Sequence, residues 1–119
     1  MKIRMNPPKY KLQPLRIPSG WEVSYNTLIE LDPSTLSIED EEKWGKFTED
    51  LLQITHSRYH LLLDVGWYPE GDPEGCYGLE LIKDFDWGNP LVDFETKQKD
   101  ELVKKIELLL WQAGSGEFN

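Results

Sequence analysis

The chain has 119 residues, with 13 lysines and arginines against 22 aspartates and glutamates, and a net charge of −9. This length fits one domain, and a hydrophobic content of 39% with five tryptophans excludes an intrinsically disordered chain. The negative charge argues against direct binding to nucleic acid, whose phosphates would be repelled, and fits a basic partner.

The N-terminal segment differs in charge from the rest of the chain. Residues 1–16 contain five basic residues and no acidic one. We therefore interpret residues 1–18 as a basic arm, which is either solvated or an edge strand that lies back on the acidic body. Residues 19–113 are predicted to form a single domain. Residues 114–119 are predicted to be a flexible tail, of a composition typical of an expression-vector remnant.

Targeting signals are not expected. The first charged residues are not followed by the apolar stretch of a signal peptide. The longest uncharged apolar runs are far shorter than a membrane span. We expect a cytoplasmic protein without a membrane partner.

Alternating polarity predicts a first strand over residues 21–31, with Trp21 and every second residue after it on one face. The next segment begins with Ser37 and Asp40 at a spacing typical of a helix start. Apolar residues then recur at helical intervals as far as Ile54, which predicts a helix over about residues 38–54.

The second half of the sequence predicts a hairpin and a closing helix. Strands are expected over residues 58–68 and 76–83, joined by a loop rich in proline and glycine, followed by a third strand over residues 91–96. Thr96 is expected to cap a last helix with one apolar stripe. This order predicts an α+β fold, with a mainly antiparallel sheet of four to five strands and two helices packed on one face.

Catalytic and metal-binding patterns are absent from the sequence. His56 and His60 have the spacing of two helical metal ligands, but His60 falls in a predicted strand. Cys76 has no neighbouring histidine motif and is interpreted as a small side chain on a strand. Phosphate-binding glycine motifs and nucleophile motifs do not occur. We predict a protein that is not an enzyme and has no cofactor and no metal.

Acidic and aromatic residues alternate over residues 70–95, where eight acids stand against Lys83 alone. Tyrosine and tryptophan are favoured anchors of protein interfaces, and surrounding acids would attract a basic protein. The alternative is a solvated acidic face, with some of the aromatic residues in the core.

Several segments resemble small immunity proteins of bacterial polymorphic-toxin and contact-dependent growth inhibition systems. The most distinctive is residues 63–79, LDVGWYPEGDPEGCYGL, followed by WGNPLVDF at residues 87–94 and an amphipathic helix. Ser19-Gly20-Trp21 and Trp44-Gly45-Lys46-Phe47 precede them. The resemblance covers roughly residues 19–111 and assigns no particular immunity family, so no functional residue is transferred from it.

The resemblance implies a cytoplasmic protein that binds a cognate toxin domain and covers its active site or an essential surface. Such toxins are often nucleases with basic clefts, which an acidic partner can occupy in place of phosphates. We expect a monomer or a 1:1 heterodimer with the toxin. The alternative is a small acidic ligand-binding or regulatory interaction module. The predicted partner-binding residues are Tyr68, Glu70, Asp72, Glu74, Asp84, Asp86, Trp87 and Asp64.

Overall fold

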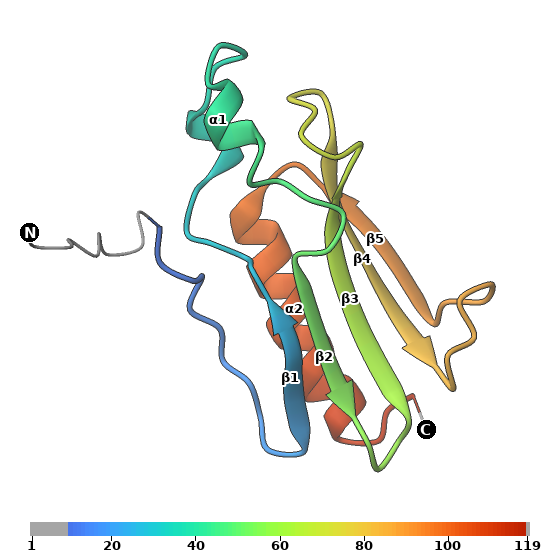
Figure 1. The fold of residues 1–119 in the computed structure, drawn as a ribbon. Coiled ribbons are helices and arrows are strands. Elements are labelled where there is room, and N and C mark those ends of the chain that lie inside the picture. Colours follow the sequence, from blue (N-terminus) through green and yellow to red (C-terminus); the bar gives the residue numbers. More distant parts are fainter. Residues whose placement is uncertain (1–9, 119) are drawn as a thin grey trace, which may run out of the picture.

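The computed structural model describes residues 10–118, and a five-stranded antiparallel sheet forms the centre of the fold (Figure 1). The strands lie in chain order, so each pairs with its neighbour in sequence. Helix α2 crosses one face, and within residues 10–118 no helix covers the other (Figure 1). The predicted α+β fold is confirmed. The elements are β1 (Trp21–Asn26), a 3-10 turn (Pro33–Thr35), α1 (Glu41–Trp44), β2 (Leu52–His56), β3 (Leu61–Tyr68), β4 (Cys76–Lys83), β5 (Val92–Thr96) and α2 (Lys99–Gly114).

The hydrophobic core lies between the sheet and α2. The apolar stripe of α2 is fully buried at Leu102, Ile106 and Leu110, as expected for a helix with one core-facing side. Every second residue of the central strands meets this stripe, including Leu63 and Leu79, which pack with no exposed surface. Each such side chain contributes about 1.5–3 kcal/mol by leaving water.

The helix predicted over residues 38–54 is wrong in its length. The helix also begins later than predicted, because Asp40 rather than Ser37 is its N-cap residue and makes no side-chain capping hydrogen bond, and α1 covers only Glu41–Trp44. The Ser37 amide donates to Asp40 Oδ2 at 2.8 Å in the turn before the helix. Leu52–His56 is instead strand β2, which pairs with β1 and β3. The apolar residues of this segment fit both the helical period of 3.6 residues and the strand period of two. Pairing with a strand on each side stabilises the strand conformation.

The first strand is also shorter than predicted. β1 ends at Asn26 rather than at residue 31, and its register shifts between Val23 and Tyr25. This β-bulge breaks the predicted single face, because it changes the side to which the following residues point. Tyr25, which follows the bulge, is 43% exposed.

The described part of the basic arm lies back on the body. Leu12 forms an isolated antiparallel bridge with Ile29, and the Arg16 amide donates to Glu107 on α2 at 2.8 Å. Lys2, Arg4 and Lys9, which carry the rest of the predicted basic charge, fall outside the described residues.

The second half follows the prediction closely. β4 has the predicted bounds, whereas β3 begins at Leu61 and β5 at Val92. Thr96 accepts from the Gln98 amide at 3.0 Å and donates to Glu101 at 2.7 Å, although Gln98 occupies the cap position of α2. Residues 115–118 form a turn after α2, with Phe118 packed against the core.

Lys99, the first residue of α2, is buried and anchors the helix to the segment after β1. Its ammonium donates to the carbonyl oxygens of Ile29 and Leu31. Burial lowers the pKa of Lys99 to about 8, against the opposing effect of Asp32 and Glu30. The unfolded chain therefore holds this proton between pH 8 and 10 while the folded chain releases it, so the free energy of unfolding should rise with pH over that interval.

We expect Lys99→Met to remove this rise. The substitution also leaves two carbonyls without a donor, which should lower the free energy of unfolding by about 1–3 kcal/mol. Urea denaturation at a series of pH values from 7 to 10 measures both effects. Parallel pH profiles for the two proteins would contradict the assignment.

Candidate functional site

The sheet face opposite α2 carries a row of carboxylates on its three C-terminal strands. Asp64 on β3 pairs directly with Glu80 on β4, which pairs directly with Asp93 on β5. Side chains at such paired positions share a face, with their Cβ atoms about 5 Å apart. We call Asp64, Glu80 and Asp93 the carboxylate row. Within residues 10–118, none of the three forms an ion pair.

A hollow lies beside this row because two glycines face each other across the strands. Gly66 on β3 pairs with Gly78 on β4, and Glu95 of β5 lies opposite Gly78. The ring of Tyr68 leans over both glycines, about 3 Å from where their Cβ atoms would be. The resulting hollow has a volume of about 340 Å³ and is lined by Tyr68, Gly78, Cys76, Glu95 and the carboxylate row.

Two carboxylates of the row have raised pKa values. Partial burial raises the pKa of Asp64 despite the hydrogen bond that Gln53 donates to it at 3.1 Å. Partial burial also raises the pKa of Glu80, and the charges of Asp93 and Asp64 add to the effect. Like charges in paired positions destabilise a sheet. The row therefore costs folding free energy and would be stabilised by a cation placed against it.

Tyr68 and Asp64 are the two predicted site residues that lie on this face. Tyr68 is 43% exposed, and its hydroxyl donates to the Glu49 carbonyl at 3.1 Å. Its neighbour Trp67 points to the core and is only 1% exposed. The two neighbouring rings therefore lie on opposite faces of the sheet, with Trp67 inside and Tyr68 outside.

Three predicted residues lie in the loop between β3 and β4, residues 69–75, next to Tyr68. Glu70 accepts from the Glu49 amide at 2.9 Å, and Asp72 accepts from the Glu74 amide at 2.8 Å. These two carboxylates therefore shape the loop. Among the described residues, the Glu74 carboxylate makes no hydrogen bond and is exposed.

The other three predicted residues lie at the opposite end of the sheet. Asp84, Asp86 and Trp87 belong to the loop between β4 and β5, residues 84–91 (Figure 1). Asp86 accepts from Asn89 at 3.3 Å, and Trp87 is 48% exposed. The eight-residue strand β4 separates the two loops by roughly 23 Å. The sequence interpretation of residues 70–95 as one rim around shared anchors is therefore corrected.

The histidines and the cysteine do not come together. His56 is buried at the end of β2, stacked on Tyr59 with ring centroids 4.8 Å apart. His60 lies in the turn before β3 rather than in a strand. Cys76 is on β4 as predicted, at the other end of the sheet. Burial and the neighbouring Glu95 raise the pKa of its thiol, so its nucleophilic thiolate form is disfavoured.

Comparison with protein-family models, curated proteins and solved structures gives no match for this chain. Within residues 10–118, no group of histidine, cysteine, aspartate and glutamate side chains has a geometry suited to a metal ion. No helix in the same residues has the length and apolarity needed to cross a membrane.

Proposed function

We propose that this chain is a non-enzymatic cytoplasmic immunity protein that binds a basic toxin domain and covers its active site or an essential surface. The carboxylate row carries the proposal. Three carboxylates in directly paired positions, without a cation among the described residues, create an electrostatic cost that a basic protein surface would remove.

The interface that we propose joins the carboxylate row to the loop at residues 69–75. Tyr68 lies between them and offers a half-exposed aromatic ring beside the hollow. An arginine or lysine of the toxin could enter the hollow, contact the carboxylates and pack against this ring. The complex would be a 1:1 heterodimer, with nuclease-type toxins favoured because their substrate clefts are basic.

The proposal predicts capture of one basic toxin domain by the intact chain from lysate of its own organism, at low salt, with partial release at high salt. The captured domain, expressed alone, should stop cell growth, and co-expression of this chain should restore it. A captured protein that is harmless when expressed would contradict the immunity function, as would a toxic one that this chain does not neutralise.

The choice of surface has its own test with the captured domain. Glu74→Lys should slow association at least tenfold at low salt, because an exposed charge beside the interface steers encounter. Asp86→Lys makes the same change of charge at the opposite end of the sheet and serves as the matched control. Stopped-flow association rates measure both variants. If both variants slow association equally, the toxin binds another surface or the effect is due to the net charge of the chain alone.

A further inference from the structure

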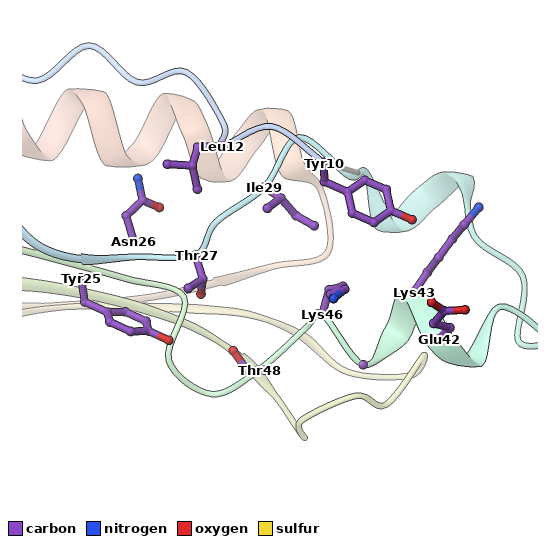
Figure 2. A pocket seen from close by; sticks show the side chains of 11 residues that line it. Tyr10, Leu12, Tyr25, Asn26, Thr27, Ile29, Glu42, Lys43, Lys46 and Thr48 are labelled. Atoms are coloured by element: carbon purple, nitrogen blue, oxygen red, sulfur yellow. The ribbon is translucent and has the colours of Figure 1, made fainter. Parts of the chain in front are cut away.

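A second and larger hollow, which shares no lining residue with the first, lies between the arm and the segment that contains α1. Its volume is about 640 Å³, which is within the range of pockets that hold small molecules. Figure 2 shows the side chains around it: Leu12 from the arm, Tyr25 and Ile29 from β1 and the residues after it, and Lys43 and Lys46 from α1 and the residues after it.

The sequence produces this hollow through two features already described. The bridge between Leu12 and Ile29 holds the arm against the residues that follow β1. The bulge in β1 precedes Tyr25, whose side chain is 43% exposed and lines the hollow. Leu12, Ile29 and the tyrosine ring thus present apolar surface that an apolar ligand could cover.

The charged side chains at the α1 side identify the kind of ligand. Lys43 and Lys46 line the hollow together with one acid, Glu42 (Figure 2). Neither ammonium makes a hydrogen bond or an ion pair among the described residues. The lining therefore carries a net positive charge, although the whole chain has a charge of −9.

We propose that this hollow binds a monocarboxylate with an apolar body, such as a medium-chain fatty acid. The carboxylate would contact Lys46, and the body would cover Leu12, Tyr25 and Ile29. Lys43, whose side chain points away from Lys46 in Figure 2, would add its positive charge at longer range. A doubly charged phosphate fits less well, because Glu42 would repel its second charge and the lining within residues 10–118 contains no arginine fork to match it. This site shares no lining residue with the hollow of the proposed toxin interface.

The test compares decanoate with decyltrimethylammonium, each below its critical micelle concentration, by isothermal titration calorimetry on the full chain. The two probes share an apolar body and differ in the sign of their charge. Net charge alone would favour the cation, so saturable 1:1 binding of decanoate in preference to the cation is the expected result. Equal or stronger binding of the cation, or no heat from decanoate, would overturn the proposal.

A pair of variants locates the site. Lys43→Met/Lys46→Met should weaken decanoate binding roughly tenfold, because each partly solvated ion pair contributes modestly. Lys97→Met/Lys104→Met removes the same charge from exposed positions outside the hollow and should leave the affinity unchanged. Amide chemical-shift changes on adding decanoate should cluster at Asn26, Thr27 and Thr48. Equal weakening in both variants, or shift changes centred elsewhere, would refute the assignment.

Discussion

Gly66→Ala is expected to lower the free energy of unfolding by about 3 kcal/mol, because a Cβ atom at this position has no space. It would lie 1.9 Å from the carbonyl oxygen of Glu49, which is backbone and cannot rotate away. The segment that holds this carbonyl is fixed on both sides. The Leu51 amide donates to Val65 at 2.9 Å, and the Trp67 amide donates to Thr48 at 2.8 Å.

Gly78 provides the matched control, since it pairs with Gly66 across the hairpin. A Cβ atom there would meet only the ring of Tyr68, at 3.2 Å. That side chain is half-exposed and can turn, so Gly78→Ala should cost less than about 1 kcal/mol. Urea denaturation of both variants measures the difference. If both variants lose the same free energy of unfolding, the Glu49 carbonyl does not lie as close to Gly66 as in the structure.

Neutralising the centre of the carboxylate row should move stability and toxin affinity in opposite directions. Glu80 has a like-charged partner on each side, so Glu80→Gln removes both repulsions and should raise the free energy of unfolding at pH 7 by about 1 kcal/mol. The same substitution should weaken binding of the toxin domain by about tenfold to a hundredfold, because a basic side chain of the toxin would lose its central carboxylate.

The pH dependence supplies an independent measurement of the same effect. The pKa values of Asp64 and Glu80 are raised above their ordinary values of 3.8 and 4.5. Above those values the folded chain holds more protons than the unfolded chain, so the contribution of this pair to stability falls as pH rises through the raised pKa values. Glu80→Gln should flatten this fall.

Glu39→Gln makes the same charge change at an exposed residue outside the sheet and is the control for both measurements. It should leave stability and affinity close to those of the unmodified chain. If Glu80→Gln destabilises the fold at pH 7, the row is not a source of repulsion. If toxin binding is unchanged, the open sheet face is not the interface.

Local patterns predicted the second half of the fold well. The β3–β4 hairpin combines a loop with two prolines and two glycines and a strand whose apolar residues alternate without ambiguity, so β4 was predicted with its observed bounds. The helix predicted over residues 38–54 was wrong from residue 45 onward for a different reason. The apolar residues there satisfy both the helical and the strand period, and only the partners on either side of β2 select the strand.

The same distinction applies to the candidate site. Tyr68 and Asp64 could be predicted to share a face because they lie four residues apart on one strand. Glu80 and Asp93 could be assigned to one row with Asp64 only once the register of three strands was known. A register is set by turn lengths and by the pattern of buried residues. The prediction from the density of acidic residues did not use a register, and it therefore placed on one surface two loops that lie at opposite ends of the sheet.

The chain-order arrangement of the strands has a consequence for how the protein reaches its fold. β3, β4 and β5 each add to the strand before them through a short loop, whereas residues 27–51 separate β1 from β2. Helix α2 comes last and covers the apolar face of all the preceding strands. During synthesis that apolar face stays exposed to other chains until residues 99–114 have been made. A ribosome that pauses before this helix would hold a nascent chain prone to aggregation.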